Sequence, residues 1–295
     1  MLQLLAVSMG DPAGIGLELA ARVWTERNSD IPRFFVLGDP DALERAAMRA
    51  GLAKPALNVV ESAAQISADP DRLDVLHIPL AKEETPGAPD PANAGATIAA
   101  IERGVGAVGG GNAAALVTLP IAKAVLLNAG FGFPGHTEFI AHLTKGAPWL
   151  HARGPVMMLA GPSLKIALVT IHTPLKDVPG ALTRGRIIEV AHVVGEALQR
   201  DFAIARPRIA LCGLNPHAGE RGHIGREEID TLIPAAAMLR AEGWNVEGPK
   251  PADTLFHAEA RAGYDAVIAL YHDQGLIPLK TLHFWEAVNV TLGLP

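Results

Sequence analysis

Three histidines, His172, His217 and His272, each come after a short apolar run. The runs are Lys165–Ile171, Ile209–Leu214 and Ala266–Tyr271. Short runs rich in Ile, Val, Leu and Ala are typical of strands buried on both faces of a parallel sheet. Ligands bind outside the carboxyl ends of strands in open α/β sheets, so we expect the three imidazoles to converge there. Three neutral imidazoles with an open fourth position are the ligand set of a catalytic divalent metal ion.

A single histidine at a strand end is more often a hydrogen-bonded structural residue than a metal ligand. In this chain the same context occurs three times, and a polar or turn-forming segment follows each histidine. The repetition favours the metal site.

One further segment is suited to binding an anion. Gly135-His136-Thr137-Glu138 follows a loop rich in glycine and proline and is predicted to open a helix. There Thr137 would cap the first turn and His136 would face an anionic ligand. By contrast, Lys123 and Glu228 are interpreted as ordinary solvated helix residues.

Two glycine-rich segments invite comparison with nucleotide-binding motifs. Gly104–Gly109 matches G-x-G-x-x-G, but a predicted helix precedes it and a predicted strand follows, the reverse of the order that the motif requires. We therefore assign it no cofactor role. Gly10–Gly16 has the order strand, turn, helix, and is interpreted first as a tight turn and second as a helix start facing an anion.

Composition limits the class of protein. The chain has 295 residues, of which 49% are hydrophobic, and is long enough for about two domains. A formal net charge of −6 without a basic run argues against nucleic-acid binding. The N-terminus lacks a basic signal region, and glycines and Pro120 break the uncharged stretch Gly104–Ala122, so we expect a soluble protein without a membrane span. The single cysteine, Cys212, suits a reducing cytoplasm and is expected to be a small buried side chain.

Strand-like and helix-like segments alternate along the whole chain, which predicts an α/β fold with mostly parallel sheets. The predicted strands are Leu2–Ser8, Phe34–Leu37, Leu73–Ile78, Ala113–Leu119, Val156–Leu159, Lys165–Ile171, Ile209–Leu214 and Ala266–Leu270, and the final run Val288–Pro295 also resembles a core strand. The predicted helices are Leu17–Thr25, Asp41–Ala50 with Asp41 as its N-cap, Gly95–Val105, Arg184–Leu198 and Glu227–Ala241.

Several motifs together resemble one family, the 4-hydroxythreonine-4-phosphate dehydrogenases (PdxA). They are GDPAGIG (10–16), GHTEF (135–139), LVTIHTPLKDVP (168–179), CGLNPHAGERGHIGREE (212–228), GPKPADTLF (248–256), YHDQGLIPLKT (271–281) and VNVTLGLP (288–295). The similarity covers essentially the whole chain in the family's order, and the LNPHAGE and YHDQG stretches are the most specific.

The resemblance implies a fold of two α/β/α domains like that of isocitrate and isopropylmalate dehydrogenases. We expect residues 1–130 with 265–295 to form one domain and 131–264 the other, with the active site in the cleft between them. It also implies a cytoplasmic homodimer whose active site lies at the subunit interface, so that one histidine of the three comes from the partner subunit. His172, His217 and His272 match the family's metal ligands, and His136, Thr137, Lys280 and Asn289 match its substrate-binding positions.

The activity implied by the resemblance belongs to pyridoxal 5′-phosphate (vitamin B6) biosynthesis. An enzyme dependent on NAD (or NADP) and on a divalent metal (Zn, Mg or Co) oxidises 4-phosphohydroxy-L-threonine to a β-keto acid, which decarboxylates to 3-amino-2-oxopropyl phosphate. The metal would lower the pKa of the alcohol. Asp253 or Asp273 would accept or relay the proton, and Asp273 is alternatively the hydrogen-bond partner of a metal-bound histidine. Lys280 would supply charge for the phosphate.

Other interpretations stay open at this point. A paralogous dehydrogenase of a 4-phospho-threonate, a 4-phospho-erythronate or an aromatic cis-diol would have the same metal site. A zinc hydrolase with three histidines and no nucleotide is a more distant alternative, and a non-enzymatic binding module is the weakest. Family members continue beyond Pro295 with a substrate-binding arginine and a loop beside the nucleotide, so we expect residues 1–295 alone to bind nucleotide weakly.

Overall fold

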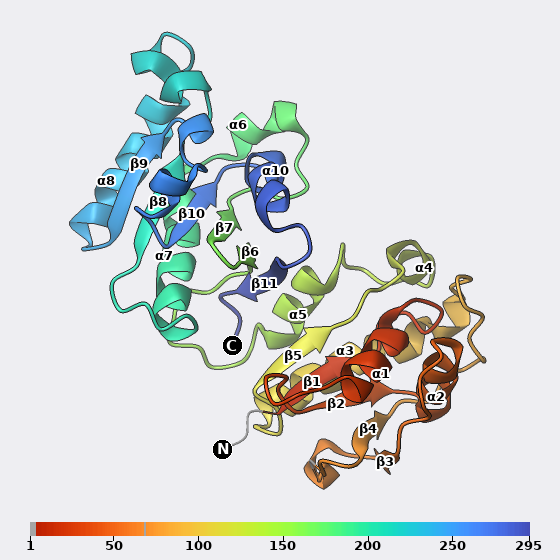
Figure 1. Ribbon diagram of the computed structural model, residues 1–295. Coiled ribbons are helices and arrows are strands. Elements are labelled where there is room, and N and C mark those ends of the chain that lie inside the picture. Colours follow the sequence, from red (N-terminus) through yellow and green to blue (C-terminus); the bar gives the residue numbers. More distant parts are fainter. Residues whose placement is uncertain (1–3, 68) are drawn as a thin grey trace. The chain divides into compact units, whose positions relative to one another are not determined.

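The computed structural model describes residues 4–67 and 69–295, and the chain divides into two compact units, residues 1–147 and 148–295. Each unit contains its own sheet, coloured from red to yellow-green in the first unit and from green to blue in the second (Figure 1). The predicted α/β class with mostly parallel sheets is confirmed. Leu2 and Gln3, which the first predicted strand includes, lie outside the described residues.

The sheet of the first unit has five strands, all parallel, in the order β3-β4-β2-β1-β5. The strands are β1 (Leu5–Ser8), β2 (Phe34–Gly38), β3 (Leu57–Val60), β4 (Leu73–His77) and β5 (Ala115–Thr118). The helices of this unit are α1 (Gly16–Thr25), α2 (Pro40–Arg49), α3 (Ala94–Gly109), α4 (Lys123–Asn128) and α5 (His136–Thr144), with the short 3-10 turns η1 (Ala63–Gln65) and η2 (Pro91–Asn93).

The sheet of the second unit has six strands in the order β11-β6-β7-β10-β8-β9. Strands β7, β10, β8 and β9 are parallel to one another, and β6 and β11 are antiparallel additions at one edge. The strands are β6 (Val156–Gly161), β7 (Leu164–Leu168), β8 (Arg208–Cys212), β9 (Asn245–Lys250), β10 (Ala266–Ala269) and β11 (Val288–Leu292). The helices are α6 (Val178–Ala181), α7 (Arg184–Arg200), α8 (Ile233–Ala241), α9 (Ala258–Arg261) and α10 (His272–His283), with short turns at η3 (Leu175–Asp177), η4 (Pro216–Gly222), η5 (Glu228–Leu232, a π-helix) and η6 (Ala252–Thr254).

Central strands of this second sheet are buried on both faces, as their uniform apolar sequences predict. In β7, Ile166 and Leu168 pack in the core that includes Leu276 and Leu279 of α10. The intervening Ala167 packs instead in the core built with α7 and α8. Successive side chains of a strand point to opposite faces of the sheet. A strand that lies between two layers of helices therefore has apolar side chains on both faces.

The two strands that the sequence patterns do not predict, β3 and β9, both lie at sheet edges. Edge strands face solvent and carry polar residues, and β9 reads Asn-Val-Glu-Gly-Pro-Lys. The final run resembles a core strand, yet β11 is also an edge strand, and its Val288 is exposed.

The division of the chain differs from the expected one. Residues 265–295 belong to the second unit, because β10 lies between β7 and β8 in its sheet. Residues 131–147 belong to the first unit, because Phe131 and Phe139 pack edge to face, with ring centroids 4.9 Å apart, in a core shared with Ile101 of α3.

Helix α2 begins earlier than predicted. Its N-cap is Asp39 and not Asp41, since the Asp39 carboxylate accepts a hydrogen bond from the backbone N–H of Ala42 at 2.9 Å. Pro40 then occupies the first helical position, where its missing N–H costs nothing. Within the described residues, no helix combines the length and apolar character needed to cross a bilayer.

Candidate active site

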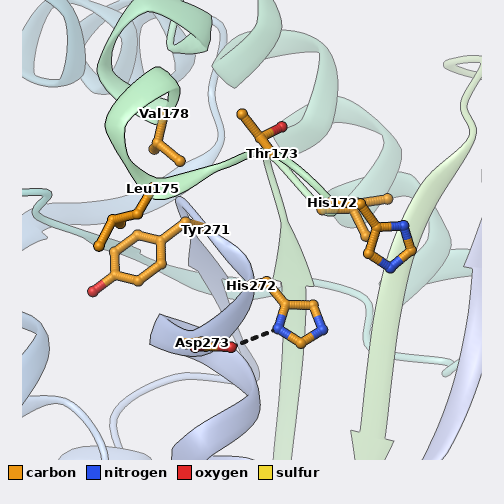
Figure 2. A pocket seen from close by; sticks show the side chains of 8 residues that line it. His172, Thr173, Leu175, Val178, Tyr271, His272 and Asp273 are labelled. Atoms are coloured by element: carbon orange, nitrogen blue, oxygen red, sulfur yellow. Dashed lines mark hydrogen bonds and ion pairs between the residues drawn. The ribbon is translucent and has the colours of Figure 1, made fainter.

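His172 and His272 meet at the ends of two neighbouring parallel strands. Beyond the last paired residues of β7 and β10, the N–H of Val169 still donates to the carbonyl of Ala269 at 2.9 Å, and that of Thr170 to the carbonyl of Leu270 at 3.2 Å. The two segments that extend β7 and β10 therefore stay hydrogen-bonded until just before the histidines. The two imidazole centroids are 6.0 Å apart (Figure 2), as the strand-end argument predicts for this pair.

A pocket of about 290 Å³ lies beside the histidine pair. It is lined by Ile171, His172, Thr173, Leu175, Val178, Tyr271, His272 and Asp273. Figure 2 shows Leu175, Val178 and Tyr271 on one side and the two imidazoles on the other. A second pocket of about 360 Å³ shares His272 and Asp273 and continues along α10 to Lys280. An apolar wall facing polar groups is typical of a site for a small molecule.

Asp273 orients the ring of His272. The Nδ1–H of His272 donates to Oδ1 of Asp273 at 2.7 Å (Figure 2). This bond leaves the lone pair of Nε2 available, which is how a carboxylate prepares a histidine to bind a metal. Asp253, the other candidate for a catalytic carboxylate, is exposed in η6 and lines neither pocket.

His217 occupies a separate loop, residues 216–222, which we call the His217 loop. His217, Ala218, Glu220 and Arg221 all have positive φ, between 43° and 56°, and Gly219 has φ 79°. Left-handed backbone costs a residue other than glycine about 1–2 kcal/mol, so the loop needs support from its surroundings. Strain of this kind is concentrated at functional sites.

Within residues 4–67 and 69–295, no group of three His, Cys, Asp or Glu side chains is placed to hold a metal ion. His172 and His272 fit two positions of a metal site by their proximity and by the free Nε2 of His272. No third side chain among the described residues of one chain is placed to complete such a site.

Glu228 is a functional candidate that the sequence patterns misassign. It is 1% exposed, which contradicts the expectation of a solvated helix residue. Its carboxylate accepts the backbone N–H groups of Leu214 and Asn215, both at 2.8 Å, at the start of the His217 loop. The signal in the sequence that could have found it is the pair Glu227-Glu228 directly after a glycine-rich loop, where one acid faces inward. Lys123 is exposed, as expected.

Of the remaining predicted residues of the second unit, only Lys280 lines a pocket together with a histidine of the pair. Lys280, on α10, lines the second pocket, and its side chain makes no hydrogen bond or ion pair with another described residue. Asn289 is exposed on β11, opposite Leu159 of β6. Cys212 is buried at the end of β8, and burial raises its pKa to about 12, which disfavours the thiolate that a nucleophile requires.

His136 and Thr137 lie in the first unit. His136 is the first residue of α5, and its Nε2 is buried without a hydrogen-bond partner. Burial lowers the pKa of His136, and the positive charge of Lys123 lowers it further, which favours the neutral imidazole. Thr137 is not the N-cap of this helix, because the N-cap is Gly135 and the helix begins at His136.

The two glycine-rich segments lie between the kinds of element that the sequence predicts. Gly104–Gly109 is the end of α3, before β5, and so has no strand leading into it. Gly10–Gly16 joins β1 to α1 by a tight turn in which a Cβ on Gly10 would lie 2.4 Å from the carbonyl oxygen of Pro120. Asp11 in this turn accepts the N–H of Ala13 at 2.8 Å, and burial raises its pKa.

The sequence and the fold of this chain are similar to those of known proteins. The profile of one family, "Pyridoxal phosphate biosynthetic protein PdxA", matches residues 30–295. A 4-hydroxythreonine-4-phosphate dehydrogenase from Caulobacter vibrioides is 53% identical over 291 residues, covering 99% of this chain and 86% of that protein. The crystal structure of a 4-hydroxythreonine-4-phosphate dehydrogenase from Klebsiella pneumoniae is similar with a TM-score of 0.88 at 38% identity, covering 99% of this chain and 88% of that one. A terephthalate 1,2-cis-dihydrodiol dehydrogenase from Burkholderia xenovorans is more distant, with a TM-score of 0.67 at 29% identity over 99% of this chain and 86% of that one.

Proposed function

Because the chain belongs to the PdxA family of pyridoxal phosphate biosynthetic proteins, we propose that it is a 4-hydroxythreonine-4-phosphate dehydrogenase. The observation that carries the proposal is 53% identity to a protein of that name over 99% of this chain. The reaction oxidises the secondary alcohol of 4-phosphohydroxy-L-threonine, with hydride transfer to NAD or NADP. The resulting β-keto acid loses carbon dioxide to give 3-amino-2-oxopropyl phosphate.

Removal of the alcohol proton requires a base within hydrogen-bond reach of the hydroxyl group, while the carbon that bears this group loses its hydride to the nicotinamide. Asp273 is the stronger of the two carboxylate candidates, because it lines both pockets and hydrogen-bonds His272, whereas Asp253 lines neither. Solvent reaches both carboxylates, so either can pass a proton to water.

A divalent metal, Zn²⁺, Mg²⁺ or Co²⁺, is part of the proposal. When bound, it supplies a Lewis acid that lowers the pKa of the substrate alcohol and stabilises the enolate formed on decarboxylation. His172 and His272 would hold it from one chain, and the proposed homodimer allows the third imidazole to come from a second copy. His217 completes the set of three.

Recognition of the phosphate and of the amino acid portion is assigned to four side chains. Lys280 supplies a positive charge beside the pocket that contains His272. His136, as a neutral imidazole at the start of a nine-residue helix, can donate or accept a hydrogen bond, and its buried Nε2 has no partner among the described residues. Thr137 and Asn289 are assigned to the substrate by the family pattern.

The second candidate function is oxidation of an aromatic cis-diol, favoured by the similarity to the Burkholderia enzyme at 29% identity. The test is the formation of NADH, followed by absorbance, with 4-phosphohydroxy-L-threonine, 4-phospho-erythronate and a terephthalate cis-dihydrodiol as separate substrates. Turnover with the first substrate alone supports the proposal. Turnover with the cis-diol and none with the phosphorylated amino acid would replace it by the second candidate.

A further inference from the structure

Buried polar side chains link the strand ends that carry the histidines. Thr170 Oγ1 donates to the carbonyl of Leu270 at 2.7 Å, which joins the end of β7 to the end of β10. The N–H of Leu270 donates to Oε1 of Gln274 at 2.7 Å, and Nε2 of Gln274 donates to the carbonyl of Gly213 at 2.8 Å. The second pair of bonds joins β10 to the chain that leaves β8. Thr170 and Gln274 are each only 8% exposed.

Glu228 continues this chain of contacts into the His217 loop. Besides the two backbone N–H groups of Leu214 and Asn215, its carboxylate accepts Nδ2–H of Asn215 at 2.9 Å. No ion pair joins Glu228 to any described cation. Gly219 of the loop lies against the same carboxylate, because a Cβ there would be 2.6 Å from Oε2.

Burial of the Glu228 carboxylate costs free energy, and the geometry of the loop that it supports explains why a carboxylate is used at this position. Burying a carboxylate without a cation is unfavourable, and three N–H donors only offset that cost. An apolar side chain at position 228 would avoid the desolvation of a charge but would leave the N–H groups of Leu214 and Asn215 without acceptors. The left-handed backbone of the His217 loop is strained at its non-glycine residues, so contacts from outside the loop must stabilise it.

We propose that Gln274 and Glu228 are positioning residues that fix the His217 loop to the end of β10. Gln274 sets the separation between the strand ends, and Glu228 sets the direction in which the chain enters the loop. His217 is thereby held in one orientation before any ligand arrives. The inference rests on the proposed function in one respect, namely that His217 is a metal ligand.

The test compares Gln274→Met and Glu228→Gln with the unaltered protein, after dialysis to remove metal. Gln274→Met keeps the volume of the side chain and removes both hydrogen bonds. Titration with Co²⁺, followed by its visible absorption, should show affinity reduced about tenfold to a hundredfold in each variant, the range found when contacts that support metal ligands are lost. His217→Ala marks the affinity expected when the ligand itself is absent.

Hydrogen exchange of the metal-free proteins, measured by mass spectrometry over residues 213–222, gives a readout that needs neither metal nor activity. Exchange in this segment should be faster in both variants. Glu84→Gln is the matched control, because Glu84 is an equally buried carboxylate, held by Arg45 and Arg49 in the first unit. It should change neither the exchange of residues 213–222 nor the Co²⁺ affinity.

The outcomes separate the inference from the proposed function. If the unaltered protein binds no Co²⁺, the proposed metal site is wrong and the inference falls with it. If the unaltered protein binds Co²⁺ and both variants bind it equally well, only the inference is overturned, whatever happens to exchange. Should one variant fail to fold, the other decides, since the two side chains act on the same loop from different elements.

Discussion

Lys280 is the positive side chain best placed to meet an anion beside the histidine pair. It lines the second pocket, and its side chain makes no hydrogen bond or ion pair with another described residue, so its charge is available to a ligand. Lys280→Ala should raise the KM for the phosphorylated substrate about tenfold to a hundredfold, by loss of a charged hydrogen bond worth about 1.5–3 kcal/mol. Steady-state kinetics measures this. Lys54→Ala, which removes an exposed lysine from the first unit, is the control, and an unchanged KM in Lys280→Ala would count against the assignment.

His136 should titrate below the ordinary histidine range. Its pKa is lowered first by burial and then by Lys123, so the folded protein resists protonating it. Below the ordinary pKa of histidine, the unfolded chain takes up a proton at this position that the folded chain does not. The free energy of unfolding therefore falls as the pH is lowered from the ordinary pKa of histidine to the lower pKa that His136 has in the folded protein. NMR titration of the imidazole checks the direction of the shift. Lys123→Met should raise the pKa only in part, because burial remains, and a normal pKa in the unaltered protein would contradict the argument.

At the scale of elements, the approach of α10 to its sheet depends on one glycine. A Cβ on Gly275 would lie 2.7 Å from Cγ2 of the fully buried Ile166 and 3.0 Å from Leu168. Gly275→Ala should therefore destabilise the protein by up to about 2 kcal/mol, the cost of overpacking less the gain in helix propensity. Chemical denaturation measures the change.

A glycine of α7 in the same unit provides the matched control for that substitution. A Cβ added to Gly185 would meet no other atom within 4 Å. Gly185→Ala should leave stability unchanged or raise it by up to about 1 kcal/mol, because the unfolded chain loses freedom. Equal effects of the two substitutions would show that helix propensity, and not the contact with β7, decides the cost at Gly275.

The central strands of this fold can be predicted from the sequence, because both of their faces are buried and their sequences are therefore uniformly apolar. For this reason the apolar pattern predicts the strands that carry His172 and His272, together with the convergence of these two side chains. It does not predict edge strands such as β9, since packing imposes no apolar pattern on an exposed edge. The expectation for Glu228 is wrong for a related reason: whether a carboxylate on a helix faces water or a loop depends on tertiary contacts that local sequence does not encode.

At the scale of the whole molecule, the proposed homodimer makes a specific prediction about mixing subunits. His172→Ala, His217→Ala and His272→Ala should each be inactive alone. If two of these histidines serve a site from different subunits, refolding the two variants together yields mixed dimers with one intact site. About a quarter of full activity then returns, assuming random pairing.

The three pairwise mixtures identify the donor of each histidine. Two histidines from the same subunit of a site give no recovery, because each mixed dimer then has one defect in each site. Recovery in two mixtures and not in the third names the pair that stays together, and the 6.0 Å separation of the rings predicts that pair to be His172 with His272. No recovery in any mixture, with dimers confirmed by light scattering, would assign all three histidines of a site to one chain.

The position of β10 also constrains the order in which the second unit is completed during synthesis. This strand lies between β7 and β8 although it is translated after both. Until Ala266–Ala269 has left the ribosome, the nascent chain must keep a gap in the middle of its sheet, with the edges of β7 and β8 unpaired and open to wrong partners. The strand ends that bring His172 and His272 together are therefore joined only by a segment that is translated after both β7 and β8, and chains released before that point should be substrates for chaperones and proteases.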